Sequence, residues 1–142
     1  LGDVYKRQVQ VSEPEVLLRV PGDRQYALAI RTALGGVAIL KDLDADTLDD
    51  LRMAADEMCD CLLHQGRTVD HLEVAVYDEG DYLKVAISAC YGEKKCPCED
   101  ETEITRAVLQ TLASDVEMTR CGDCVQCITL LLHKATAPLK KQ

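Results

Sequence analysis

The sequence predicts an α/β domain in which one mixed β-sheet carries helices on one face. Apolar residues recur at helical spacing in two long segments, residues 23–40 and 46–66. The segments 72–77 and 82–89 instead alternate apolar and polar residues, as half-buried strands do. The expected order of elements is β-α-α-β-β-α-β-β. A two-layer sandwich is the simplest arrangement that buries the apolar faces of all these elements.

The first half of the domain is predicted to contain a strand and two helices. The strand "EVLLRV" (15–20) ends at the break Pro21-Gly22, and a helix follows over 23–40. The second helix should begin near Asp46 or Thr47, both good N-caps, and should end at Gly66. The expected buried positions are Tyr26, Ile30, Ala33, Leu34 and Val37 in the first helix, and Leu48, Leu51, Ala55, Met58 and Leu62 in the second.

The second half should begin with a hairpin whose turn is "DEGD" (78–81). A cysteine-rich loop then leads to a third helix over 101–113, with Ile104, Val108 and Leu112 expected to face inward. Strands at 115–120 and 127–133, joined by a turn at 121–126, should complete the sheet.

Length and composition indicate one globular domain, because 142 residues with 47% hydrophobic content can form a proper core. We expect the domain to cover 15–134. Residues 1–14 are expected to be an artefactual or disordered leader, and residues 135–142 a flexible tail.

The net charge of −9 opposes binding to nucleic acid or to an anionic membrane and favours a protein or small-molecule partner. No apolar run approaches the roughly 20 residues of a membrane span, and no secretory signal is present, so we expect a cytoplasmic protein. The eight cysteines should then stay reduced.

Five of these cysteines suggest a metal centre. Cys96 and Cys98 lie in the loop, and Cys121, Cys124 and Cys127 form "CGDCVQC". Four of them could hold zinc, with Cys90 or Cys61 as substitute ligands, or an iron–sulfur cluster. Reactive thiols, or cysteines without a special role, remain as alternatives. The three histidines, His64, His71 and His133, look isolated.

The order of elements, the opening "VPGDRQYALAIRTAL" and the helix end "DEMCDCLLHQG" resemble bacterial anti-sigma factors of the sporulation and general-stress type. These are serine kinases with the GHKL, or histidine kinase-like, ATPase fold. The resemblance covers roughly residues 15–134. It implies a regulator that binds a sigma factor or an anti-anti-sigma factor and that dimerises through its sheet.

The family's helix motif places a Glu, the candidate general base, four residues before an Asn that binds the Mg²⁺ of the nucleotide. Here Glu57 is present, but Cys61 occupies the Asn position. A thiolate is a poor ligand for Mg²⁺, which prefers oxygen. Without its Asn partner, Glu57 is equally consistent with a solvated helix residue.

The family's second motif, Asp-x-Gly-x-Gly, holds the adenine. Ala89 occupies the Asp position, Tyr91 and Glu93 occupy the two Gly positions, and Gly92 lies between them. The Gly-rich phosphate loop is replaced by "EDETEIT", whose acidic residues would repel a triphosphate. Mg-ATP binding is therefore expected to be absent or weak.

Three functions remain open at this stage. The first is an anti-sigma-like partner-switching module that has lost ATP binding and catalysis. The second is a metal-binding or thiol redox-sensing regulator on the same fold. The third is an active protein serine/threonine kinase with Glu57 as its base.

Overall fold

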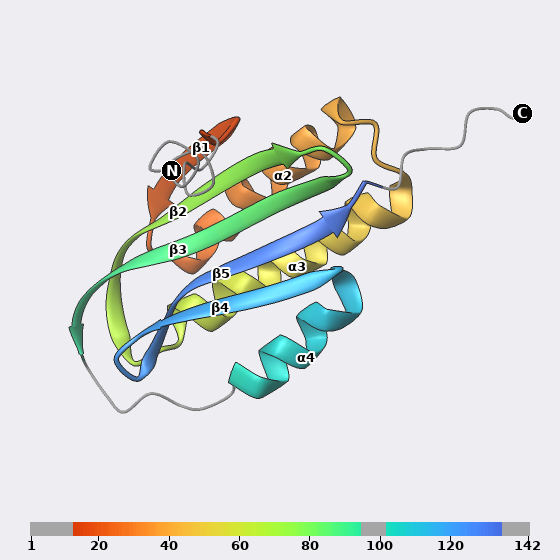
Figure 1. The fold of residues 1–142 in the computed structure, drawn as a ribbon. Helices are drawn as coiled ribbons and strands as arrows, with labels where there is room; N and C mark the ends of the chain where they lie inside the picture. The colour runs from red at the N-terminus through yellow and green to blue at the C-terminus, as the bar shows by residue number, and fades with distance from the viewer. Residues whose placement is uncertain (1–12, 95–101, 135–142) are drawn as a thin grey trace, which may run out of the picture.

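A computed structural model describes residues 13–94 and 102–134. A five-stranded sheet runs diagonally across the molecule (Figure 1), with the strands in the order β1-β2-β3-β5-β4. The strands are β1 (Val16–Pro21), β2 (Arg67–Glu79), β3 (Tyr82–Lys94), β4 (Asp115–Cys121) and β5 (Cys124–His133). The leader and tail expected at 1–14 and 135–142 lie largely or wholly outside the described residues.

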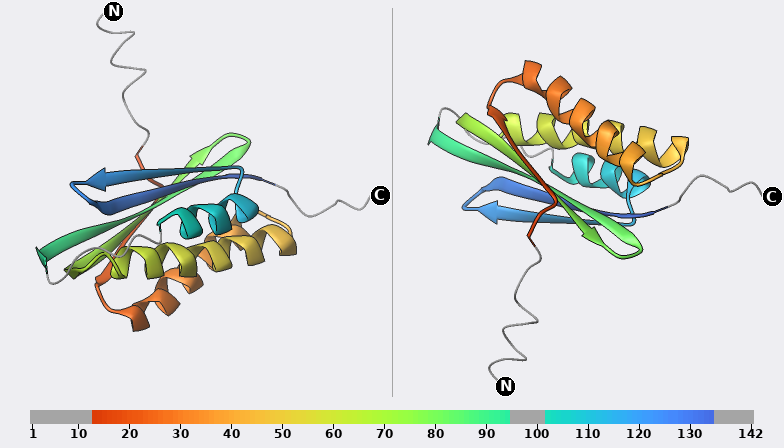
Figure 2. Two further views of the ribbon diagram at one scale, coloured as in Figure 1. Left: turned by 90° about the horizontal axis from the view of Figure 1, so that it is seen from below. Right: turned by 90° about the horizontal axis from the view of Figure 1, so that it is seen from above.

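Three α-helices form the second layer: α2 (Ala27–Leu40), α3 (Ala45–Leu63) and α4 (Thr102–Leu112). A short 3₁₀ helix, η1 (Arg24–Tyr26), precedes α2. The two views of Figure 2 show all three α-helices on one side of the sheet, as predicted. In the part of the chain that the structure describes, no helix is long and apolar enough to cross a membrane.

In one respect the sheet differs from the prediction, because all four strand pairs are antiparallel rather than mixed. Two helices, α2 and α3, connect β1 to β2. The first residues of β2 therefore lie beside the end of β1, where Pro21 pairs with His71. One helix separates β3 from β4, which gives these two strands the same direction. However, β5 lies between them, and every neighbouring pair is therefore antiparallel.

The core lies between the sheet and the helices. In α3, the predicted face is buried, with Leu51, Met58 and Leu62 fully covered. The alternation in β3 is also confirmed, since Leu83, Val85, Ile87 and Ala89 are buried. The remaining aliphatic core residues of the sheet are Val20, Leu72, Val74, Val76, Val116, Val125, Ile128, Leu130 and Leu132.

Helix α3 begins earlier than predicted. Its N-cap is Asp44, whose carboxylate accepts a hydrogen bond of 2.8 Å from the backbone N–H of Thr47. This bond lowers the pKa of Asp44. Asp46, predicted as a possible cap, instead lies in the first turn, where a negative charge is favoured by the helix dipole.

Helix α4 is rotated relative to the predicted face, although Leu112 packs against the core as predicted. Its buried residues are Thr102, Thr105 and Leu109, whereas Ile104 is 66% exposed. The helix packs mainly against α3. The prediction assumed that the apolar side chains would all be inward, but two threonines occupy the positions that contact the rest of the domain.

Candidate functional site

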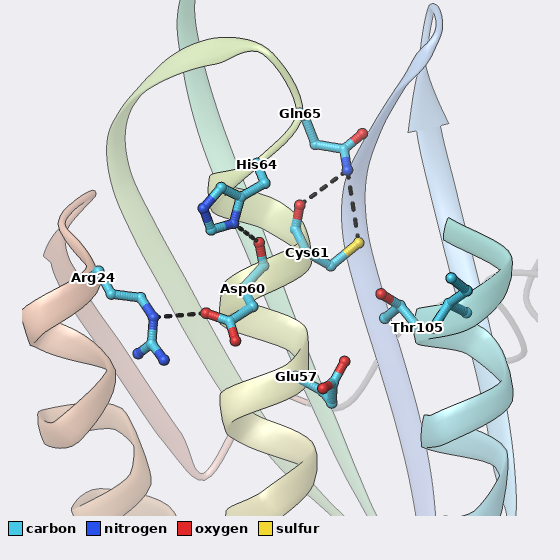
Figure 3. Close-up of a pocket in the computed structure, with 8 residues that line it drawn as sticks. Arg24, Glu57, Asp60, Cys61, His64, Gln65 and Thr105 are labelled. Carbon is cyan, nitrogen blue, oxygen red and sulfur yellow. Dashed lines mark hydrogen bonds and ion pairs between the residues drawn. The ribbon is translucent and has the colours of Figure 1, made fainter. Parts of the chain in front are cut away.

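An open cavity of about 500 Å³ lies between α3, α4 and η1 (Figure 3). It contains both residues that the sequence aligned with the helix motif, Glu57 and Cys61. One helical turn separates these two residues on α3, so their side chains reach the same cavity. The lining residues are Arg24, Glu57, Asp60, Cys61, His64, Gln65, Ile104 and Thr105.

Cys61 is held in this cavity by Gln65. The Gln65 amide donates a hydrogen bond of 2.9 Å to the Cys61 carbonyl, and its nitrogen lies 3.7 Å from the Cys61 sulfur. Cys61 is only 8% exposed and Gln65 only 3%. The position expected to carry a metal-binding amide thus carries a largely buried thiol beside the side-chain amide of Gln65.

Gln65 also ties α3 to the last hairpin. Its side-chain oxygen accepts a hydrogen bond of 2.9 Å from the backbone N–H of Val125. The thiol of Cys124 donates to the Gln65 carbonyl at 3.4 Å. Cys61 and Cys124 therefore both contact Gln65, which joins the start of β5 to the end of α3 beside the cavity.

The charges around the cavity partly neutralise one another. Arg24 forms an ion pair with Asp60, with 2.6 Å between Nε and Oδ1. His64 donates through Nδ1 to the backbone carbonyl of Asp60 at 2.7 Å. Glu57 lies on the opposite side of this group in Figure 3, toward α4. Among the described lining residues, the arginine is already paired with a carboxylate, and two carboxylates are present. The lining is therefore unfavourable for binding an anion.

Ala89 and Gly92, the other predicted nucleotide positions, do not line this cavity. Ala89 is 3% exposed and pairs with Leu72 within the core. The carbonyl of Gly92 accepts hydrogen bonds of 2.9 and 3.2 Å from Arg67. A Cβ added at Gly92 would lie 2.4 Å from the Thr68 hydroxyl oxygen. Gly92 thus permits the close approach of β2 to β3.

Tyr91 occupies the space between α3 and β5. Its hydroxyl oxygen lies 2.9 Å from the carbonyl of Leu62 and 2.6 Å from that of Val125, and it can donate its proton to one of them at a time. A large side chain therefore stands where the resembled motif has glycine.

The structure separates the cysteines of "CGDCVQC". Cys121 is exposed at the end of β4, and Cys124 is buried at the start of β5. Cys127 pairs with Ser88 and lies on the other face of the sheet, where burial raises its pKa. Within the described ranges these three thiols do not form a ligand cluster, and Cys96 and Cys98 lie outside those ranges.

Cys59 is fully buried in α3, and burial raises the pKa of its thiol to about 12. Cys59 is therefore a small core residue rather than a reactive thiol. Gln65, Arg24 and Thr105 also line the cavity, and none of the three was predicted from the sequence. The spacing of Gln65, four residues after Cys61, would have been a usable signal because it continues the Glu57–Cys61 helical row.

Comparison with known proteins supports the resemblance. No protein-family model matches the chain. The anti-sigma-F factor RsbW of Mycobacterium tuberculosis, from strains CDC 1551 and H37Rv, is 30% identical over 105 residues. This match covers 72% of the chain and 60% of the relative, so the chain spans less than two thirds of that protein.

The fold is also found in a crystal structure of the RsbU and RsbW domains of Rv1364c from the same species. The TM-score is 0.61 at 14% sequence identity, and the match covers 87% of this chain and 35% of that one. At 14% sequence identity, this match is evidence for the fold alone.

Proposed function

We propose that this chain, a relative of the anti-sigma factors with the histidine kinase-like ATPase fold, is a cytoplasmic partner-binding regulator of transcription that no longer uses ATP. The proposed partner is a sigma factor or an anti-anti-sigma factor. The likeness to RsbW supports the regulatory role. The cavity at Glu57 and Cys61 supports the loss of ATP.

The lining of the cavity, as far as the structure describes it, is poorly suited to a magnesium nucleotide. The side chain at the amide position is Cys61, and a thiol is a poor Mg²⁺ ligand. Arg24, which could contact phosphate, is paired with Asp60. Two carboxylates, Glu57 and Asp60, add repulsion toward a triphosphate. We therefore assign Glu57 no catalytic task.

An unpartnered face of α2 supports binding to a protein. Leu28 is 58% exposed, Ile39 is 67% exposed and Leu40 is 81% exposed. Leu28, Thr32, Gly36 and Ile39 follow one another at helical steps of four, four and three, and all are exposed. Exposed apolar residues along one stripe are typical of protein-binding helices. We name this row the α2 stripe.

We assign self-association to the face of the sheet that the helices leave open (Figure 2). Small or uncharged side chains occupy its centre, which would let a second sheet approach closely. They are Ala75, Ala86, Ser88, Cys127 and Thr129.

Binding measurements with purified sigma factors and anti-anti-sigma factors of the source organism test the proposal. Replacing Leu28 and Ile39 with Asp should weaken binding by at least about 30-fold, corresponding to about 2 kcal/mol for a central contact. Met53→Asp is the matched control, because Met53 is 56% exposed but lies on α3 rather than on α2. If the wild type, the Leu28→Asp/Ile39→Asp double variant and the control variant bind with equal affinity, the α2 stripe is not the binding face.

A further inference from the structure

A group of potential metal ligands lies on β2 and β3, apart from the cavity. A carboxylate oxygen of Asp70, a ring nitrogen of His71 and the sulfur of Cys90 all lie within 4.8 Å of one another. Among the described residues, no other group of three His, Cys, Asp or Glu side chains is this close. His71 is therefore not isolated, contrary to the expectation from the sequence.

A β-bulge brings these residues together. His71 pairs with Cys90, and the next pair is Val69 with Tyr91, so Asp70 is an extra residue in β2. A bulge redirects side chains that would otherwise alternate between the two faces. Asp70 and His71 are adjacent in sequence, yet both approach the same thiol across the strand pair.

The group lies on the face of the sheet without helices. The neighbours Leu72 and Ala89 point into the core, so His71 and Cys90 point to the opposite side. Cys90 is exposed and reduced in the structure. The side chain of His71 is 19% exposed, and Asp70 is 78% exposed. Solvent therefore reaches the group, while the imidazole is held largely in place.

We propose that Asp70, His71 and Cys90 form a zinc-binding site with one position left for water. Thiolate, imidazole and carboxylate are the three ligand types that zinc uses, and Mg²⁺ or Ca²⁺ would prefer oxygen alone. Zinc bonds of about 2.0–2.3 Å place tetrahedral ligands about 3.3–3.8 Å apart. The present separations require only small side-chain movements to reach this geometry.

The backbone is suited to holding these ligands. His71 and Cys90 are on paired strands rather than on a loop, which gives ligand positions greater precision. The carbonyl of Asp70 accepts a hydrogen bond of 3.2 Å from the N–H of Gly22 and so anchors the bulge. Asp70 and His71 are hydrogen-bonded at 2.8 Å between Oδ2 and Nδ1, and this bond must open for both side chains to bind the same ion. The zinc proposal does not rest on the proposed anti-sigma role, and its site lies on the sheet face that we assign to self-association.

Site-resolved alkylation of the full chain tests the proposal. The metal-free, reduced protein is treated with iodoacetamide with and without zinc, and each cysteine is followed by peptide mass spectrometry. Zinc should slow alkylation of Cys90. Cys121 is the matched control, since it is equally an exposed thiol but lies outside the group. Protection of Cys90 should disappear in His71→Ala and Asp70→Asn.

Cobalt titration supplies a second measurement. A thiolate-to-cobalt absorption band should appear in the wild type and in Cys121→Ser, and Cys90→Ser should weaken cobalt binding at least tenfold. Loss of an outer-shell partner alone costs about 10–100-fold in metal affinity, so loss of a ligand should cost no less. The proposal fails if Cys90 is not protected. It also fails if the band depends on Cys96, Cys98 or Cys121 and persists without His71 and Cys90.

Discussion

The side chain of Gln65 accepts a hydrogen bond from the backbone N–H of Val125 at 2.9 Å and so joins the end of α3 to the start of β5. Gln65 is 3% exposed. Replacing it with Leu would leave a buried N–H without its partner, which costs about 1–3 kcal/mol. We expect Gln65→Leu to lower the free energy of unfolding by this amount in urea denaturation. Gln110→Leu, at an exposed position of α4, should change it by less than about 0.5 kcal/mol.

Isothermal titration calorimetry should detect no binding of Mg-ATP at millimolar nucleotide. The physical reason is the combination of a thiol at Cys61, the Arg24–Asp60 ion pair and the acidic stretch before α4. Cys61→Asn alone should not create binding, because the phosphate contacts would still be missing. A micromolar dissociation constant that requires Mg²⁺ would overturn the proposed loss of ATP and revive Glu57 as a catalytic base.

Two residues of α4 should respond very differently to truncation. Leu109 is fully buried, and Leu109→Ala should destabilise the protein by about 2–5 kcal/mol. Ile104 is 66% exposed, and Ile104→Ala should cost less than about 0.5 kcal/mol. Thermal or urea unfolding of both variants measures the difference. Similar losses would mean that α4 is rotated toward the face expected from its sequence.

The stability of the domain should fall in acid through Asp78. Ion pairs with Lys134 and Lys41 lower the pKa of Asp78 from 3.8 to about 2. A carboxyl whose pKa is lowered by folding stabilises the folded state above its unfolded pKa. This contribution should be complete above pH ~4 and lost as the pH falls toward ~2.

Melting temperatures measured across this pH range would check the assignment. Asp78→Asn should reduce the melting temperature at neutral pH and flatten its dependence on pH below ~4. Asp81→Asn is the control, because Asp81 is exposed in the same hairpin and makes no ion pair within the described residues. An unchanged acid profile in Asp78→Asn would show that other carboxyls dominate.

The elements that the sequence predicted best are those with strong apolar periodicity. Leu51, Met58 and Leu62 recur along α3, and burial follows this pattern directly. The face of α4 was predicted only in part: Leu112 packs against the core, but the buried residues Thr102 and Thr105 are polar and are not found by a search for apolar periodicity. The sheet was expected to be mixed, whereas all described strand pairs are antiparallel because β5 lies between β3 and β4.

Which side chains lie close together in space was the hardest feature to predict from the sequence. Glu57 and Cys61 could be placed together because four residues make one helical turn. His71 and Cys90 meet through strand register and an extra residue at Asp70, and neither leaves a local pattern in the sequence. The hypothesis of a metal centre at Cys96, Cys98, Cys121 and Cys124 stays a prediction.

The pairing of β1 with β2 has a consequence for the order in which the chain folds. Val16 pairs with Val76, so the first strand leaves the ribosome well before its partner exists. Contacts between residues far apart in sequence form slowly because a long loop must close first. The α2–α3 pair and the β2–β3 hairpin can form from local contacts, and β1 then adds to an existing edge. A nascent chain is therefore most exposed to aggregation through "VLLRV" until the synthesis of β2 is complete.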